Sequence, residues 1–164
     1  MTIDLVIPAR NEEENIVSTI ERIEKTLNLD YRIIVVNDHS TDNTVNLAKD
    51  LAAKYANITL VDNAAENGFG ASLKNGLGAS EADLIIPVMA DLCGDLNTIQ
   101  RMRAKILEGY DVICGSRYTP GGAKQGGPLI QSFFSKFVGR ALKYLTGIPT
   151  SDAANSFKCF KKSV

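Results

Sequence analysis

Two aspartates follow a short apolar stretch near the middle of the chain. Residues 84–88 are all apolar, and Asp91 and Asp95 come soon after them. An apolar run of this length is typical of a strand that is buried on both faces of a parallel sheet, and ligands of open α/β sheets bind just beyond the carboxyl ends of such strands. We therefore expect Asp91 to take part in chemistry, and Asp95 to cap the helix that follows. The alternative for Asp91 is that it is only a second cap.

Polar residues also follow two other expected strands. Asn37 and Asp38 come after the run 31–36, and Arg117 lies in the sequence Gly-Ser-Arg-Tyr after the run 111–114. Amide and carboxylate groups can fix a base or ribose in a mostly apolar pocket, and arginine can bind a phosphate through two hydrogen bonds. An Asx turn would explain Asn37 and Asp38 equally well, and an arginine at a sheet edge is more often solvated.

A glycine pair, Gly68 and Gly70, stands just before an expected helix. Backbone N–H groups at such a helix start can bind phosphate. The spacing does not match a dinucleotide fingerprint, which needs a third glycine and follows the first strand, and no Walker A motif is present. A ligand contact at Gly68 and a plain glycine turn both remain open.

Apolar periodicity indicates the elements that would position these residues. Short apolar runs predict strands at residues 3–7, 31–36, 58–61, 84–89 and 111–114. Amphipathic stretches with helical spacing lie between them. Strands that alternate with helices predict an α/β fold with a doubly wound, mostly parallel sheet that is flanked by helices.

Three segments add detail to this pattern. Asn11, followed by three glutamates, is typical of a capped helix start. Four glycines and two prolines in residues 119–128 predict a flexible loop. After this loop, residues 130–145 predict another amphipathic helix, and a short last strand should contain Phe157 and Phe160.

Composition limits the classes of function. The chain of 164 residues has the size of one domain, and its formal net charge of −1 argues against general nucleic-acid binding. Its three cysteines lack the spacing of a zinc site, and His39 is the single histidine. We expect a reduced, cytoplasmic compartment, because the N-terminus lacks the apolar core of a signal peptide. No apolar run approaches the roughly 20 residues of a membrane span.

The helix expected at residues 130–145 suits a membrane surface. Its apolar stripe and its basic flank hold three residues each: Phe133, Phe134 and Phe137, and Lys136, Arg140 and Lys143. A basic amphipathic helix of this kind lies in the membrane interface, so we expect peripheral attachment at the cytoplasmic face of a membrane. The alternative is that the phenylalanines pack against the sheet.

Five polar or glycine-containing motifs lie at residues 7–12, 35–44, 67–71, 89–92 and 115–122. Together they resemble those of family 2 glycosyltransferases of the GT-A fold, and most of all the dolichol-phosphate mannosyltransferase-like group. The motifs fall at strand ends in the order that this family has, and the similarity extends over nearly the whole chain. The resemblance implies a single GT-A domain over residues 1–164.

The resemblance also implies an activity and a set of site residues. The activity would be inverting transfer of a sugar from GDP-mannose or a UDP-sugar to a polyprenyl or dolichyl phosphate. Mg²⁺ or Mn²⁺ would bind at Asp91, which would be catalytic together with Arg117. The resemblance implies that the nucleotide binds Pro8, Arg10, Asn11, Glu12 and Asp38. We add Asn37 and Gly68 to these expected nucleotide-binding residues, because they stand at a strand end and at a helix start. The acceptor phosphate would meet Arg117, Ser135 and Lys136, beside the loop 119–128.

The chain departs from the family pattern near the expected site. Met89 replaces the first aspartate of the usual Asp-x-Asp motif, and Asn37 stands where an aspartate is common. One carboxylate can still hold a metal through the diphosphate and water, but we expect a weaker metal affinity. A non-catalytic nucleotide-sugar-binding domain is therefore the main alternative. A sugar nucleotidyltransferase ranks last, because residues 9–12 lack the glycine-rich basic loop of that class.

The later part of the chain bears on the mechanism. In this part, Asp152 is the one acidic residue that we consider a candidate general base. A polyprenyl phosphate is already anionic and needs no deprotonation, so catalysis would reduce to positioning and charge neutralisation. The chain ends soon after the last expected strand, where family members continue, and we expect it to be a shortened catalytic domain.

Overall fold

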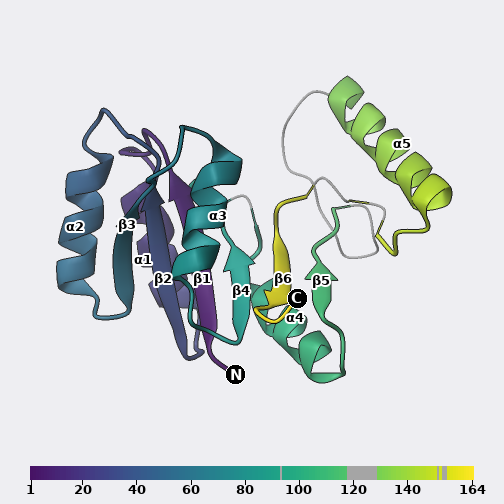
Figure 1. Cartoon of the computed structure of the whole chain (residues 1–164), viewed down its shortest axis with the longest axis horizontal. Helices are drawn as coiled ribbons and strands as arrows, with labels where there is room; N and C mark the ends of the chain where they lie inside the picture. Colours follow the sequence, from purple (N-terminus) through teal and green to yellow (C-terminus); the bar gives the residue numbers. More distant parts are fainter. Residues whose placement is uncertain (93, 118–128, 151, 153–154) are drawn as a thin grey trace.

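The computed structural model describes residues 1–92, 94–117, 129–150, 152 and 155–164, with the backbone alone for 129–136 and 140. The loop expected at 119–128 lies outside these residues. Within them, strands and helices alternate from the N-terminus to α4, as the sequence predicts (Figure 1).

The strands form one mixed sheet in the order β3-β2-β1-β4-β6-β5. The four strands β1 to β4 are parallel, whereas β6 runs antiparallel to both of its neighbours. Their bounds are β1 Ile3–Ala9, β2 Tyr31–Asn37, β3 Ile58–Asp62, β4 Leu84–Pro87, β5 Val112–Cys114 and β6 Lys158–Lys161. The predicted doubly wound, mostly parallel sheet is thus confirmed, and the carboxyl ends of β1 to β4 meet at one edge.

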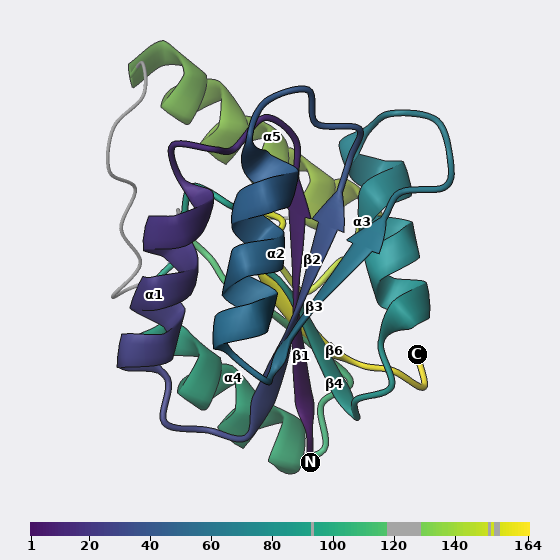
Figure 2. The same ribbon diagram turned by 90° about the vertical axis from the view of Figure 1, so that its left-hand side faces the viewer.

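Helices cover both faces of this sheet (Figure 2). Their bounds are α1 Ile16–Thr26, α2 Thr44–Lys54, α3 Phe69–Ala79, α4 Asn97–Leu107 and α5 Leu129–Thr146. The larger core joins α1, α2 and α4 to one face, and α3 packs on the other through Leu73 and Leu77. Gly76 allows this close approach of α3, because an added Cβ would clash with a methyl of Val6.

The start of α1 differs from the prediction. Asn11 does not cap this helix, which begins five residues later at Ile16. The backbone of Asn11 is left-handed, with φ 54°, and its side chain accepts a hydrogen bond from the backbone N–H of Thr41 at 2.8 Å. A long-range bond therefore replaces the local cap, and Asn11 becomes part of a loop at the carboxyl edge of the sheet.

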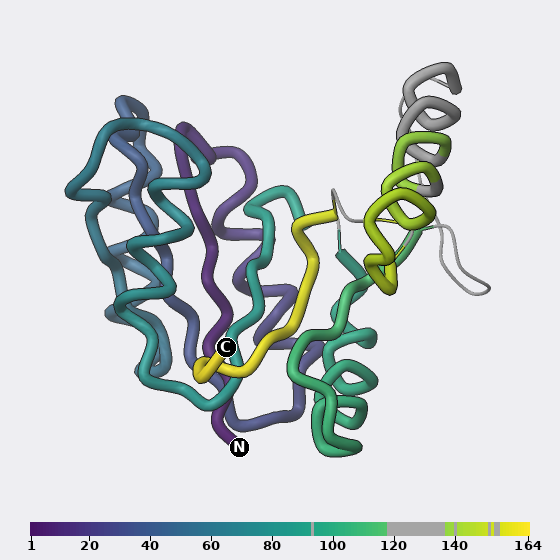
Figure 3. The backbone as a smooth tube through the Cα atoms, turned by 45° about the vertical axis from the view of Figure 1, so that its right-hand side comes forward, coloured from purple at the N-terminus to yellow at the C-terminus, as the bar shows by residue number. Residues whose placement is uncertain are grey.

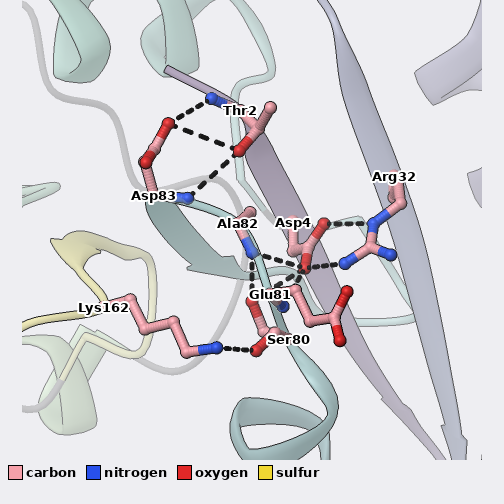
Figure 4. A network of polar contacts seen from close by, with 8 residues as sticks. All are labelled: Thr2, Asp4, Arg32, Ser80, Glu81, Ala82, Asp83 and Lys162. Atoms are coloured by element: carbon pink, nitrogen blue, oxygen red, sulfur yellow. Dashed lines mark hydrogen bonds and ion pairs between the residues drawn. The ribbon is translucent and has the colours of Figure 1, made fainter.

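An ion pair with a buried carboxylate lies at the opposite, amino edge (Figure 4). Asp4 is fully buried, and Arg32 of the neighbouring strand donates to both of its carboxylate oxygens, at 2.9 and 2.8 Å. Ser80 adds a third hydrogen bond at 2.7 Å. Burial raises the pKa of Asp4, but the hydrogen bonds from Arg32 and Ser80 outweigh it and leave that pKa below its ordinary value. The group ties β1 and β2 to the turn after α3.

Helix α5 stands away from the other helices, beyond β5 and towards the carboxyl edge of the sheet (Figures 1 and 3). Several apolar side chains on its described part are exposed, including Phe137 at 64% and Tyr144 at 88%. Among the described residues, no helix is long and apolar enough to cross a membrane. Phe133, Phe134, Ser135, Lys136 and Arg140 belong to this helix, but their side chains lie outside the description.

Candidate functional site

Left-handed residues follow three of the parallel strands. Among the described residues other than glycine, positive φ angles occur at Asn11 after β1, His39 after β2 and Leu92 after β4, with values of 54°, 55° and 49°. Each such conformation costs about 1–3 kcal/mol and persists where the surrounding structure enforces it, often at functional sites. The carboxyl edge is therefore the part of the sheet where the backbone is most constrained.

The loops after β1 and β2 hold each other through hydrogen bonds. The backbone N–H of Asn11 donates to the hydroxyl of Ser40 at 3.2 Å, and Asn11 accepts from Thr41 in return. The N–H of Glu12 donates to the hydroxyl of Thr44 at 2.8 Å. The structure thus brings together the two segments that hold most of the residues expected to bind the nucleotide.

Asp38 lies buried where these loops meet the start of α3. Its side chain is 4% exposed. The amide nitrogen of Asn63 donates to Asp38 Oδ1 at 2.6 Å, and the backbone N–H of Gly68 donates to Asp38 Oδ2 at 3.0 Å. Gly68 has φ 147°, in the region that favours glycine. The predicted residues Asp38 and Gly68 are therefore neighbours at one point of the edge.

Asn63 was not predicted from the sequence. It follows β3, is 4% exposed, and shares its oxygen between the backbone N–H of Ala65 and the side chain of Asn75 on α3. Its nitrogen also donates to the carbonyl of Glu66 at 3.2 Å. Asn63 thus fixes both Asp38 and the β3–α3 turn. The rule that singled out Asn37 and Asp38, a polar residue just after a strand, would have identified it.

The other residues expected at the nucleotide differ in environment. Asn37 makes a local bond to the turn after β2, since its oxygen accepts from the N–H of Ser40, three residues on, at 3.0 Å, and its nitrogen donates to Asp62 at 2.9 Å. Pro8 is half-buried within β1 and Arg10 is exposed beside it. A local role of Asn37 in the turn is therefore observed, and nucleotide contacts of Asn37, Pro8 and Arg10 stay predictions.

Asp91 lies exposed in the turn that follows β4. Two hydrogen bonds hold this turn: the N–H of Leu92 donates to the carbonyl of Met89 at 2.9 Å, and buried Thr19 of α1 donates to the carbonyl of Ala90 at 2.5 Å. In the part of the chain that the structure describes, no three acids, histidines or cysteines form a metal-binding group. A single exposed carboxylate still suits Mg²⁺ or Mn²⁺, which need few protein ligands when a diphosphate supplies others.

Asp95 caps the helix after this turn, as expected. Its carboxylate accepts the backbone N–H of Asn97 at 3.0 Å, and a second oxygen lies 3.4 Å from the hydroxyl of Thr98. The two aspartates after the central strand therefore differ: Asp95 is committed to α4, and Asp91 lies in the exposed turn before it.

Arg117 forms a two-point ion pair with Asp152. Its Nε and Nη2 atoms donate to the carboxylate at 2.9 and 2.7 Å, and its backbone N–H donates at 3.0 Å. The Arg117 side chain is 33% exposed, whereas that of Asp152 is buried at 2%. Burial raises the pKa of Asp152, but the hydrogen bonds from Arg117 outweigh it, so that pKa lies below its ordinary value. The two residues are 35 positions apart in sequence.

Phe157 connects this ion pair to the segment after Asp91. The backbone N–H of Gly115 donates to the carbonyl of Phe157 at 2.9 Å. An added Cβ would lie 3.1 Å from the Phe157 ring at Gly94 and 3.0 Å from it at Gly115. The ring therefore packs between the segments that follow β4 and β5, and both glycines leave room for it.

A comparison with protein families gives one match over nearly the whole chain. The model described as "Glycosyl transferase family 2" matches residues 4–164. A dolichol-phosphate mannosyltransferase of Pyrococcus furiosus is 31% identical over 100% of this chain and 47% of its own length. An undecaprenyl-phosphate 4-deoxy-4-formamido-L-arabinose transferase of Pseudomonas fluorescens is 28% identical over 99% of this chain and 47% of its length. The chain spans about half the length of these curated relatives.

Solved structures share the fold. Glucosyl-3-phosphoglycerate synthase of Mycobacterium tuberculosis, in complex with Mn²⁺, UDP and glucosyl-3-phosphoglycerate, gives a TM-score of 0.72 at 20% identity, over 99% of this chain and 57% of that one. A mannosyltransferase of Pyrobaculum calidifontis with GDP-Man and Mn²⁺ gives 0.53 at 22% identity, over 59% and 30%. At these identities the likeness shows the fold alone, and it confirms the predicted GT-A architecture.

Proposed function

Because the chain belongs to glycosyl transferase family 2, we propose that it binds a nucleoside-diphosphate sugar across the carboxyl ends of β1, β2 and β4 and transfers the sugar to a polyprenyl phosphate. The observation that carries this proposal is the buried carboxylate of Asp38 at the point where three loops meet. A polar group whose orientation is fixed in this way is suited to select a base or ribose.

The nucleotide half of the site is supported by the joined loops. Asn11 and Glu12 are held against the loop after β2 by hydrogen bonds of 2.8–3.2 Å. Loops that are already ordered lose less conformational entropy when a ligand binds. Pro8, Arg10, Asn37 and Gly68 complete the proposed nucleotide contacts on the same edge of the sheet.

The metal half of the site would depend on Asp91. A divalent ion held by Asp91 would supply Lewis-acid stabilisation of the departing nucleoside diphosphate. The chain contributes one exposed carboxylate, Asp91, and the backbone just before it is fixed, because Thr19 of α1 donates to the carbonyl of Ala90. Both named solved structures were determined with Mn²⁺.

A phosphate acceptor would not need a general base, and the candidate base Asp152 is poorly suited to that role. Asp152 is committed to Arg117, and its lowered pKa makes it a weak proton acceptor. A polyprenyl phosphate oxygen carries its own negative charge and needs no base. The names of the two curated relatives, a dolichol-phosphate and an undecaprenyl-phosphate transferase, support the same class of acceptor. Arg117, Ser135 and Lys136 are the proposed contacts to its phosphate.

Helix α5 is the proposed contact with the membrane that holds such an acceptor. Phe137, Tyr144 and Leu145 expose 64%, 88% and 83% of their surfaces, and Lys143 lies exposed among them. Apolar and basic side chains together favour a peripheral position at the interface. Exposed side chains of this kind support the proposal of peripheral attachment, which we assign to the cytoplasmic face of a membrane.

A second function is favoured by Met89. This residue stands where the family has its first metal-binding aspartate, and a site with one carboxylate holds metal weakly. The chain would then bind a nucleotide sugar without transferring it. Transfer of radiolabelled sugar to a short-chain prenyl phosphate would separate the two functions, because only the enzyme yields a labelled lipid.

The binding part of the proposal is tested by thermal shift. GDP-mannose, UDP-glucose and UDP-GlcNAc, each with and without Mn²⁺, should include one donor that raises the Tm of the protein. Asp38→Ala should abolish that rise, whereas Asp50→Ala, at an exposed position of α2, should keep it. Equal shifts in the Asp38→Ala variant and the unchanged protein would show that the nucleotide binds elsewhere.

A further inference from the structure

Asp152 is a buried acid to which the proposed reaction gives no step. Its side chain is 2% exposed, yet it faces three N–H groups of a single residue. The Nε and backbone N–H of Arg117 donate to Asp152 Oδ2 at 2.9 and 3.0 Å, and Nη2 donates to Oδ1 at 2.7 Å. A two-point contact fixes the plane of the guanidinium as well as its position.

Two chemical roles are open to a carboxylate in this place. A general base would have to leave Arg117 and take up a proton. Burial raises the pKa of Asp152, but the hydrogen bonds from Arg117 outweigh it, and the positive charge of Lys158 acts in the same direction as they do. The carboxylate therefore stays ionised and paired, which suits a holding role better than proton transfer.

Two residues that follow Asp152 in the chain also bond to the segment that leads into Arg117. The amide nitrogen of Asn155 donates to the carbonyl of Gly115 at 3.0 Å, and the N–H of Gly115 donates to the carbonyl of Phe157 at 2.9 Å. Backbone and side chain are thus fixed together just before and at Arg117. An arginine whose only task is solubility needs neither restraint.

We propose that Asp152 is a positioning residue, which holds the guanidinium of Arg117 at the carboxyl end of β5 in the orientation that receives the phosphate of the acceptor. This role rests on the proposed function, since it requires an anionic ligand at Arg117. A charge that is already oriented stabilises an anion without reorganisation at the moment of reaction. Loss of Asp152 should therefore weaken acceptor binding and leave nucleotide binding unchanged.

The chain contains a matched control for this test. Asp4 and Arg32 form an ion pair of the same kind, with a buried carboxylate and two N–H donors, at the opposite edge of the sheet. Asp152→Asn and Asp4→Asn each remove one charge from such a pair, so both should lower the Tm. Only Asp152→Asn should act on the ligand.

The first measurement is calorimetric titration with geranyl phosphate in the presence of GDP or UDP. Asp152→Asn should raise the Kd of geranyl phosphate roughly tenfold, because a guanidinium that is no longer oriented makes weaker charge-assisted hydrogen bonds to phosphate, and it should leave the Kd of the nucleotide unchanged. Asp4→Asn should change neither Kd. An unchanged Kd in Asp152→Asn, or an equal rise in Asp4→Asn, would overturn the proposal.

The second measurement needs no ligand. The NMR signal of the Arg117 Nε–H, identified by its loss in Arg117→Lys, should exchange slowly with water in the unchanged protein and rapidly in Asp152→Asn. Equal exchange rates would show that Asp152 does not hold Arg117. If the unchanged protein binds neither nucleotide nor geranyl phosphate, the proposed function fails, and this comparison still decides whether Asp152 orients the guanidinium.

Discussion

The backbone N–H of Gly68 donates to the carboxylate of Asp38 at 3.0 Å and so ties the end of β2 to the start of α3. Asn63 donates to the same carboxylate at 2.6 Å. Buried carboxylates are stable when N–H groups satisfy them. Asp38 is thus restrained from two elements, which makes its orientation sensitive to changes at Asn63.

The substitution Asn63→Asp should damage this part of the site. It places a second carboxylate next to Asp38 and removes a donor, and we expect a loss of about 2 kcal/mol in the free energy of unfolding. Urea denaturation followed by circular dichroism measures this loss. Asn46→Asp, at an exposed position of α2, adds the same charge and should cost little. Equal losses in the two variants would show that the charge alone is responsible.

The substitution Met89→Asp should tighten metal binding. It restores a second carboxylate two residues before Asp91, and metal affinity rises with the number of charged ligands. In calorimetric titrations with GDP or UDP present, we expect the Kd of Mn²⁺ to fall roughly tenfold relative to the unchanged protein. Asp91→Asn should weaken binding instead. Strong Mn²⁺ binding by the nucleotide-free, unchanged protein would point to ligands other than Asp91.

Stability should fall in acid partly because of Asp4. Burial raises the pKa of Asp4 in the folded protein, but hydrogen bonds from Arg32 and Ser80 lower it by more. The folded pKa therefore lies below its ordinary value. A carboxyl group of this kind stabilises the fold above its unfolded pKa and loses that contribution as pH falls through the folded pKa. The free energy of unfolding should therefore drop below about pH 4. Urea titrations at pH 6 to 3 should show a shallower drop in Asp4→Asn; an identical slope would exclude Asp4 as a source.

Helix α5 should bind anionic lipid weakly and in a salt-sensitive way. Each basic side chain near an anionic leaflet contributes about 1 kcal/mol. The protein should therefore co-sediment with vesicles that contain phosphatidylglycerol at low salt and remain in the supernatant at high salt. Replacing Lys136, Arg140 and Lys143 together by alanine should abolish the low-salt signal.

A matched triple variant controls for the loss of three positive charges. Lys25, Lys49 and Arg101 are exposed on α1, α2 and α4, and their replacement by alanine changes the net charge by the same amount. This variant should still sediment with the vesicles. If both triple variants lose binding equally, net charge rather than α5 governs the interaction, and an absence of binding at low salt would remove α5 from the membrane altogether.

The strands of the sheet could be predicted because their signal is local. The run 31–36 is apolar enough to identify a buried strand, and the structure has β2 at Tyr31–Asn37. The direction of β6 gave no such signal, since the apolar pattern of a four-residue strand does not state its orientation and tertiary contacts decide it. The predicted start of α1 was wrong for a similar reason, because a long-range contact decided it. Asn11 has a cap-like sequence, but its partner Thr41 is 30 residues away.

The candidate site shows the same division. Asp38 and Gly68 were identified from their places after a strand and before a helix, and the structure brings them into contact. The bond between Asn63 and Asp38 joins residues 25 positions apart, and the pairing of Arg117 with Asp152 spans 35. Residue types at strand ends indicate where polar groups gather. Which of them bond to each other depends on distances that only the folded chain sets.

The ion pair of Arg32 with buried Asp4 closes the sheet at the edge away from all the proposed ligands. Substitutions in the loops after β1, β2 and β4 therefore leave the Asp4–Arg32 ion pair intact. A protein built in this way can exchange one donor or acceptor for another through changes at one edge, while the opposite edge keeps the strands in register. Libraries aimed at new sugar specificity should accordingly vary the carboxyl-end loops and hold Asp4, Arg32 and Ser80 constant.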